Sequence, residues 1–331
     1  MFDLDRIGEV SVGLLGDLAV DIYWYADMKK SELSRETPHF PLPVVREVTS
    51  LGAGGNVAAN IAALKPGRLS VCGIRGDDWR GGILSALLER IGADTSGLIV
   101  EKGRFTHAYC KPMRMGISDV VYEDPRLDFA ASVPPAEESE DAILSWLDRV
   151  DGRIDVLCVC DQFLCGAVTD RVLARLGRMK TPVMADSRYR IGQYAVRGVL
   201  KPNEDECRSA LRAQVRAVPD DHEAMARALA AQTGADVLLT LGERGSLFCP
   251  AGPGPAVVTP AVRVDGPVDI CGAGDTSLSA FACCTAAGAS PAEAARIAAA
   301  ASAVTVRKLG TTGTASREEI AGLLRAMDET R

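Results

Sequence analysis

Short apolar runs that end at a polar residue recur along the chain and predict the strands of a parallel sheet. A strand buried on both faces reads as a continuous apolar run of this kind. Segments with apolar residues at helical spacing, such as 57–64 and 83–91, alternate with them. The predicted strands cover residues 10–15, 156–160, 183–185, 199–200 and 236–240. We therefore expect an α/β fold with one doubly wound, mostly parallel sheet and helices on both faces, with residues 1–331 as a single domain.

Polar residues directly after these strands locate a ligand crevice. Ligands of open α/β sheets bind outside the carboxyl ends of the strands, so we expect Asp17, Asp161 and Asp186 to line one edge. Asn203 follows another strand, with Glu206 three residues later at a predicted helix start. That spacing is also typical of a helix cap.

The segment from residue 23 to 48 interrupts this rhythm. It has mixed polarity and carries Pro38, Pro41 and Pro43. Proline fixes φ and removes a backbone donor, so such segments suit edge strands and flaps better than core helices. We expect that kind of extended structure here.

A Gly-Ala-Gly turn between Asp269 and Thr276 opens directly into the apolar, helix-compatible run 277–287. The first N–H groups of a helix lack intrahelical acceptors, and the helix dipole adds partial positive charge there. Glycine lets a phosphate approach the backbone closely. The pattern predicts an anion-binding turn around Asp275, although a carboxylate at this point can also be a simple helix cap.

A second glycine-rich stretch, residues 52–64, leads into another predicted helix. Gly54 and Gly55 allow a ligand to approach the backbone, and Asn56 offers both a donor and an acceptor. Asn60, one turn later, fits either a ligand contact or a satisfied core amide. The stretch lacks the third glycine and the acidic residue of a dinucleotide fingerprint. Walker A and protein-kinase motifs are also absent from the sequence, which excludes those two kinase classes.

Composition narrows the class of partner. The chain has 37 Lys and Arg against 44 Asp and Glu, a net charge of −7, which argues against a nucleic acid partner. The ten cysteines form no Cys-x-x-Cys metal pattern and favour buried, reduced thiols. The apolar region 278–306 is broken by Gly288 and Pro291, which predicts two soluble helices and no membrane span. Because residues 1–9 are short and charged, we expect no signal peptide and a cytoplasmic protein.

The Asp269 to Thr276 stretch resembles the C-terminal signature of the ribokinase-like (PfkB) family of carbohydrate kinases, and the resemblance extends over about residues 10–323. It implies a ribokinase-like fold in which segments 22–50 and 105–130 form a small β-sheet lid, whose exposed sheet favours a homodimer. In that family the aspartate at the position of Asp275 is the catalytic base. The resemblance implies ATP and Mg²⁺ as cofactors and a sugar or sugar phosphate as acceptor. The amides expected to form the anion hole are those of Gly272, Ala273 and Gly274.

The resemblance assigns the acceptor to one end of the crevice. It implies contacts from the Gly-Asp-x-x-x-Asp element at residues 16–21, from the glycine stretch and from the lid. Two lid cations could reach an acceptor phosphate, but they lie three apart on a strand, so at most one faces inward. The acceptor-binding residues expected are Asp17, Asp21, Gly54, Gly55, Asn56, Asn60, Lys111 and Arg114.

The resemblance assigns the nucleotide to the other end. Asn203 and Glu206 match the family's Asn-x-x-Glu element, which would hold Mg²⁺ through water. Residues 240–245 match a turn against the nucleotide phosphates, and the loop at 308–316 resembles one that often holds a monovalent cation. The residues expected at the nucleotide are Asn203, Glu206, Thr240, Gly242, Gly245 and Arg188, which is also a candidate for an acceptor phosphate. Those expected around K⁺ are Asp269, Ile270, Gly310 and Ser316.

Within the family, segments 16–25, 43–45, 126–129 and 308–311 resemble the heptose 7-phosphate kinases of the ADP-heptose pathway. This resemblance implies phosphorylation of a heptose 7-phosphate-type acceptor at its anomeric hydroxyl. The Asp-Ser-Arg at 186–188 departs from that group's Asp-Pro-Lys, and the 161–166 segment lacks its lysine, which leaves the sugar open. The alternatives are another acceptor (a neutral sugar, fructose phosphate, nucleoside or vitamin) and a catalytically silent sugar- or nucleotide-sensing protein on the same fold.

Overall fold

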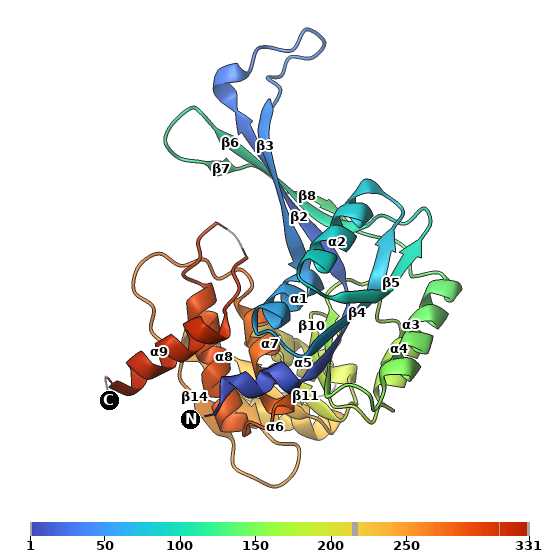
Figure 1. The fold of residues 1–331 in the computed structure, drawn as a ribbon, viewed down its shortest axis with the longest axis vertical. Coiled ribbons are helices and arrows are strands. Elements are labelled where there is room, and N and C mark those ends of the chain that lie inside the picture. Colours follow the sequence, from blue (N-terminus) through green and yellow to red (C-terminus); the bar gives the residue numbers. More distant parts are fainter. Residues whose placement is uncertain (1, 214–217, 311, 330–331) are drawn as a thin grey trace.

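One large sheet forms the centre of the protein in the computed structural model, which describes residues 2–213, 218–310 and 312–329 (Figure 1). Nine strands of the described residues pair in the order β14-β13-β12-β11-β10-β9-β1-β4-β5. The pairs from β12 to β5 are parallel, while β13 and β14 add antiparallel strands at one edge. The strands are β1 (Ser11–Gly16), β4 (Arg68–Gly76), β5 (Asp94–Glu101), β9 (Val156–Asp161), β10 (Val183–Ser187), β11 (Gly198–Leu200), β12 (Asp236–Thr240), β13 (Ser246–Cys249) and β14 (Val257–Thr259).

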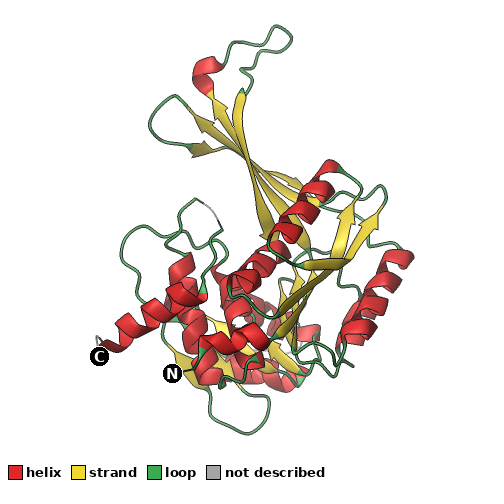
Figure 2. Cartoon of the chain, in the orientation of Figure 1, coloured by secondary structure: helices red, strands yellow, loops and turns green. Residues whose placement is uncertain are grey.

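Helices cover both faces of this sheet, which confirms the expected doubly wound architecture (Figure 2). One face packs against α1 (Gly54–Ala63), α2 (Trp79–Arg90), α7 (Ala273–Ala286), α8 (Pro291–Thr305) and α9 (Arg317–Glu329). The other packs against α3 (Glu137–Val150), α4 (Asp170–Leu176), α5 (Glu204–Arg212) and α6 (His222–Thr233). Short 3-10 helices are η1 (Leu4–Glu9), η2 (Met28–Lys30), η3 (Ile191–Gln193) and η4 (Gly242–Arg244).

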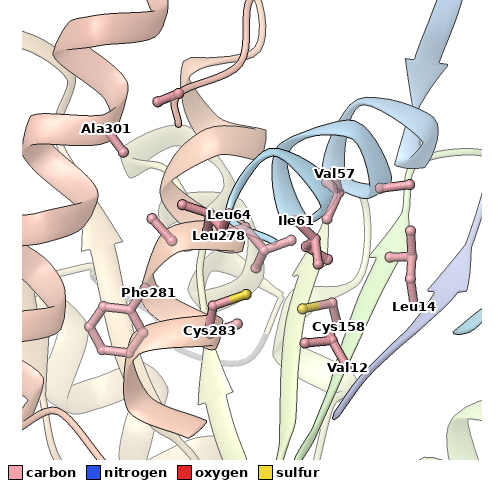
Figure 3. Packing of buried hydrophobic residues seen from close by; sticks show 14 of the residues in the cluster. Val12, Leu14, Val57, Ile61, Leu64, Cys158, Leu278, Phe281, Cys283 and Ala301 are labelled. Atoms are coloured by element: carbon pink, nitrogen blue, oxygen red, sulfur yellow. The ribbon is translucent and has the colours of Figure 1, made fainter. Parts of the chain in front are cut away.

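Strand β9 shows why the apolar runs predict this arrangement. Its residues alternate between two cores: Cys158 packs in the cluster with α1 and α7, whereas Leu157 and Val159 pack with α3 and α4. Both faces are therefore buried, and no polar position interrupts the run. Figure 3 shows Cys158 in the first core, with Cys283 and Ile61 close by.

A second sheet projects from the main body as a lid (Figure 1). Its strands pair in the order β3-β2-β6-β7, and β8 pairs with β6. The Pro38 to Pro43 stretch lies in the connection between β2 and β3. The lid strands are β2 (Leu18–Asp27), β3 (Val44–Ala53), β6 (His107–Met115), β7 (Tyr122–Glu123) and β8 (Leu127–Phe129). The lid therefore begins at Leu18, a few residues before the predicted segment 22–50, because β2 follows β1 after a single residue.

The composition predicts buried, reduced thiols and no membrane-spanning helix. All ten cysteines are free thiols, and all except Cys165 and Cys271 are at least nine-tenths buried. In the described part of the chain, no helix combines the length and the apolar character needed to cross a lipid bilayer.

Candidate active site

Helix α7 begins at the Gly-Ala-Gly turn and carries Asp275 in its first turn. Gly272 has a left-handed conformation (φ 80°), and a side chain there would lie 2.4 Å from the Thr312 side chain. The Ala273 amide, one of the expected anion-hole donors, donates to the Ile270 carbonyl at 3.2 Å. A phosphate that uses this amide must displace that contact, so the turn is only partly open.

The Asp275 carboxyl is half-buried, and this burial raises its pKa to about 7. The charge of Asp186 raises the pKa further, whereas the Lys201 ammonium and a hydrogen bond from the Asn56 side chain lower it. A general base is most effective when its pKa lies near the working pH. The carboxyl therefore suits proton abstraction near neutral pH.

A buried ion pair beside Asp275 was missed as a site by sequence reasoning. Lys201 Nζ lies 2.8 Å from the Asp186 carboxylate, and both side chains are largely buried. A side chain at Gly274 would come within 3.6 Å of that ammonium, so Lys201 lies at the start of α7. Both residues were visible as polar ends of strands. Nothing local marked them further, because β10 and β11 meet only in the folded sheet.

The pH dependence of activity should follow Asp275. We expect kcat/KM for the acceptor to rise with an apparent pKa near 7, because the base must be ionised and kcat/KM reports the free enzyme. Asp186→Asn removes a negative charge that raises the pKa of Asp275 and frees the Lys201 ammonium, which lowers that pKa. The acid side of the pH–rate profile should therefore move to lower pH. An unmoved limb in pH–rate profiles of the two proteins would contradict this assignment.

The same shift affects stability in the opposite sense. The pKa of Asp275 in the fold lies above its ordinary value of 3.8, so the folded state favours the protonated form. Asp275 therefore contributes its full stabilisation of the fold below pH 3.8, and this stabilisation is lost as the pH rises to about 7.

Asn203 and Glu206 form a reciprocal cap at the start of α5. The Glu206 N–H donates to Asn203 Oδ1 and the Asn203 N–H donates to Glu206 Oε2, both at 2.8 Å. The cap interpretation is confirmed. Burial and the charge of Asp186 raise the pKa of Glu206, so two carboxylates compete for positive charge here. Oxygen donors of this kind suit a hydrated Mg²⁺. Groups of three or more His, Cys, Asp or Glu placed to hold a metal do not occur among the described residues.

The turn predicted to contact the nucleotide lies against this cap. Thr240 forms an isolated bridge with Asn203, and its hydroxyl donates to the Pro202 carbonyl at 3.2 Å. Gly242 and Gly245 have left-handed conformations (φ 60° and 94°), which glycine adopts without strain. The structure thus brings together the residues expected at the nucleotide and at Mg²⁺.

Helix α1 begins beside α7 and places Asn56 next to Asp275. Gly54 and Gly55 are buried, and a side chain at Gly54 would lie 2.7 Å from the Asp17 carbonyl. These glycines allow the helix start to pack against the base of the lid. The structure gives them this packing role, and their contact with an acceptor stays a prediction.

Asn60, another expected acceptor contact, is a satisfied core amide. It is 2% exposed, donates to the Asn56 carbonyl at 2.9 Å and accepts from the Thr276 hydroxyl at 2.8 Å. It therefore ties α1 to α7 and fixes Asn56 relative to Asp275. Of the two interpretations the sequence left open, the structure supports the structural one.

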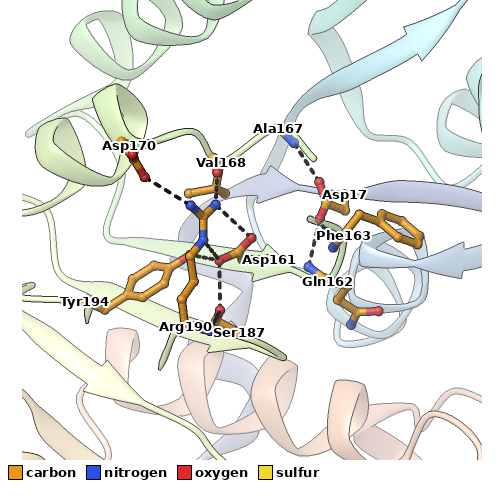
Figure 4. Close-up of polar contacts among 10 residues, drawn as sticks. All are labelled: Asp17, Asp161, Gln162, Phe163, Ala167, Val168, Asp170, Ser187, Arg190 and Tyr194. Carbon is orange, nitrogen blue, oxygen red and sulfur yellow. Dashed lines mark hydrogen bonds and ion pairs between the residues drawn. The ribbon is translucent and has the colours of Figure 1, made fainter. Parts of the chain in front are cut away.

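Asp17 holds a loop, and the expected sugar contact is not what the structure shows. It is 2% exposed, and its oxygens accept the amides of Gln162, Phe163 and Ala167 at 2.7–2.8 Å (Figure 4). Burial raises its pKa to about 6. The loop places the Phe163 ring edge-on against His107, with ring centroids 4.0 Å apart.

Asp161, the residue directly before this loop, is the centre of a buried polar network (Figure 4). Its carboxylate accepts hydrogen bonds from Ser187 and Tyr194 at 2.8 Å and from Arg190 at 2.9 Å. Arg190 also donates to the Val168 carbonyl. The loop after β9 is therefore fixed at both ends.

Asp21, the second carboxylate of the Gly-Asp-x-x-x-Asp element, is likewise buried, at 4% exposed. Burial raises its pKa, and its charge in turn raises the pKa of Asp275. Lys111 Nζ lies 3.6 Å from Asp21 and 3.0 Å from the Tyr23 hydroxyl.

The three cations expected near an acceptor phosphate separate in the structure. Lys111 faces Asp21, but Arg114 lies on the opposite face of β6 and pairs with Asp124 at 2.9 Å. Arg114 is therefore removed from the acceptor site. Arg188 follows β10, and its charge lowers the pKa of Glu206, which places it towards the nucleotide end.

One of the segments predicted to hold K⁺ contacts the end of α8, two residues before the 308–316 loop. The Asp269 amide donates to the Val306 carbonyl at 2.8 Å. Ser316 directly precedes α9, and its hydroxyl accepts from the Glu319 amide at 3.2 Å. Lys308 lies in the same loop and pairs with Glu319 at 2.7 Å. Of the other expected residues, Ile270 and Gly310 are exposed, and Thr311 of the 308–311 stretch lies outside the described residues.

Comparison with known proteins assigns the family. A family model described as pfkB family carbohydrate kinase matches residues 173–318, which include α7 and the Asn203 cap. The chain is 32% identical to the bifunctional protein HldE of Trichlorobacter lovleyi over 317 residues, which cover 94% of this chain and 62% of that protein. Residues 173–318 thus belong to a PfkB family carbohydrate kinase domain.

Solved structures show the same fold as this chain. Phosphofructokinase-2 from Escherichia coli, in complex with potassium, aligns with a TM-score of 0.74 at 18% identity. Ribokinase from Thermotoga maritima aligns with a TM-score of 0.70 at 21% identity. Each alignment covers 96% of this chain and 99% of the other. At these identities the likeness concerns the fold alone, and the chain spans less than two thirds of the HldE relative.

Proposed function

We propose that this protein transfers the γ-phosphate of ATP to a hydroxyl of a sugar or sugar phosphate. The observation that carries the proposal is the cluster of Asp275, Lys201 and Asn56 at the start of α7, with the pKa of Asp275 at about 7. Asp275 takes the proton of the acceptor hydroxyl. At the same time the hydroxyl oxygen bonds to the γ-phosphorus, and ADP leaves. The amides of the turn and the Lys201 ammonium receive the charge of the transferred group.

The nucleotide end is inferred from the cap and the neighbouring turn. ATP would lie along residues 240–245, with Asn203, Glu206 and Asp186 around a hydrated Mg²⁺. Their oxygens and their competing negative charge fit that ion. When bound, Mg²⁺ would offset phosphate charge. K⁺ would lie between Asp269 and the loop at 308–316.

The acceptor that we favour is a heptose 7-phosphate-type sugar, phosphorylated at its anomeric hydroxyl. Support comes from the resemblance of segments 16–25, 126–129 and 308–311 to that group of kinases. The HldE relatives add to it, since several align at about 30% identity over nearly the whole chain. Asp21, Asn56 and Lys111 would hold this acceptor beneath the lid.

A panel of acceptors tests the proposal. ADP release is measured with heptose 7-phosphate, fructose 6-phosphate, neutral sugars, adenosine and pyridoxal. We expect the sugar phosphates to be turned over fastest. Turnover of adenosine or pyridoxal alone would change the acceptor class. No turnover with any acceptor would favour a sensing protein and contradict the proposal.

We also infer that the lid sheet joins a second copy of the chain. Strand β3 lies at one end of the described lid sheet, and exposed apolar patches of this kind mark interaction surfaces. The exposed apolar residues of the lid include Phe40, Val44, Val45, Val48, Val121 and Tyr122. We expect a dimer in sedimentation velocity and a monomer after Val45→Asp. A monomer at every concentration of the unmodified protein would contradict the inference.

A further inference from the structure

One face of the lid carries a row of polar side chains, of which the proposed function uses only Asp21 and Lys111. Asp128 on β8, Tyr109 on β6 and Asp21 on β2 lie directly opposite one another in neighbouring strands. Residues paired in this way share a face of the sheet. Lys111, two residues beyond Tyr109, lies on that face too. Because the charge of Asp21 reaches Asp275, this is the face towards the reacting groups.

Arg126 covers this row. Its guanidinium lies over the Tyr109 ring, 4.3 Å from the centroid. It binds both oxygens of Asp128, at 2.5 and 2.7 Å. The two side chains are 43% and 46% exposed, so their attraction is screened and easily exchanged. The guanidinium thus lies over Tyr109, on the face of the sheet that also carries Lys111, and binds a carboxylate that can be replaced.

Two cations therefore converge on the acceptor end of the crevice. Lys111 lies 3.6 Å from Asp21, and the charges of both Lys111 and Arg126 lower the pKa of that carboxyl against the effect of burial. A guanidinium binds phosphate through two parallel charge-assisted hydrogen bonds, whereas an ammonium acts as a point charge. The pair thus has the chemistry of a phosphate receptor.

We propose that Arg126 and Lys111 bind a phosphate group that the acceptor already carries, and that Asp128 occupies the arginine fork until that phosphate replaces it. The inference rests on the proposed function and names the residues that would select a phosphorylated acceptor. It replaces Arg114 of the original expectation with Arg126. Arg126 was missed as a site residue because its position over Tyr109 depends on the pairing of β6 with β8.

The chain offers a matched control. Arg114 is also a lid arginine paired with an aspartate, Asp124, but it lies on the opposite face of β6. Arg126→Ala and Arg114→Ala therefore remove the same charge from the same sheet. They differ in the face that loses it.

The experiment compares KM for fructose 6-phosphate and heptose 7-phosphate with KM for the unphosphorylated sugars. We expect Arg126→Ala to raise KM about 10- to 100-fold for the phosphorylated acceptors and by less than about threefold for the neutral ones. Arg126→Lys should fall between, because it keeps the charge and loses the fork. Arg114→Ala should match the unmodified protein. Asp128→Asn should lower KM for the phosphorylated acceptors, since it empties the fork.

Two results would overturn the inference. One is an equal rise of KM for phosphorylated and neutral sugars in Arg126→Ala, and the other is identical behaviour of Arg126→Ala and Arg114→Ala. Both leave the kinase assignment intact, because the unmodified protein still turns over ATP. If the unmodified protein phosphorylates no acceptor, calorimetric titration with fructose 6-phosphate decides. Binding lost in Arg126→Ala and kept in Arg114→Ala supports the receptor, and equal binding refutes it.

Discussion

Asp275→Asn is expected to lower kcat by about 10²- to 10⁴-fold, the range for loss of a general base. The asparagine keeps the size and hydrogen-bonding capacity of the carboxyl but cannot accept the hydroxyl proton. KM for ATP and for the acceptor should change little, since the helix start and Lys201 remain. Steady-state kinetics at saturating substrates measures the effect.

Folding provides the control for this variant. The raised pKa of Asp275 means that its ionised form destabilises the fold near neutral pH, so Asp275→Asn should melt at the same temperature or higher. Asp265→Asn, an aspartate 84% exposed in the loop before the turn, should leave kcat unchanged. A kcat within about threefold of the unmodified protein would remove Asp275 from the mechanism.

Arg190→Ala is expected to lower the free energy of unfolding by about 3–5 kcal/mol, because it leaves the buried Asp161 carboxylate without its cation. The Asp161 side chain is 3% exposed and depends on Arg190 for two of its hydrogen bonds. The variant also removes the contact of Arg190 with the Val168 carbonyl, directly after the loop that Asp17 holds. Urea denaturation followed by circular dichroism gives the loss.

Arg171 serves as the matched comparison. It also pairs with two carboxylates, those of Glu140 and Asp141, but its side chain is 51% exposed. Arg171→Ala should therefore cost less than about 1 kcal/mol. Equal losses for the two variants would show that the Asp161 network does not contribute as a buried ion pair.

The parts of the fold that local sequence determines were predictable. Strands such as β9 are buried on both faces, so their continuous apolar runs mark both position and length. The start of α7 was equally clear, because glycines followed by an apolar helical run leave unpaired N–H groups at one point. The cap of Asn203 and Glu206 depends on residues three apart and follows from spacing alone.

Residues whose roles depend on tertiary pairing were not predictable. Asp17 and Asp21 are four residues apart, but β1 ends at Gly16 and β2 begins at Leu18. The first contacts the loop after β9, while the second pairs with Lys111 of the lid. Asn60 meets Thr276 across 216 positions of the chain. No spacing rule shows such a contact.

Phosphorus-31 NMR of a reaction with ATP, Mg²⁺ and heptose 7-phosphate tests the central claim most directly. If Asp275 acts as the base that deprotonates the acceptor hydroxyl, a new sugar phosphate resonance should appear, and its amount should equal that of the ADP formed. That growth should be absent with Asp275→Asn over the same period. ADP formed with inorganic phosphate alone, or an unchanged ATP spectrum with every sugar tried, would contradict the claim that this protein is a sugar kinase.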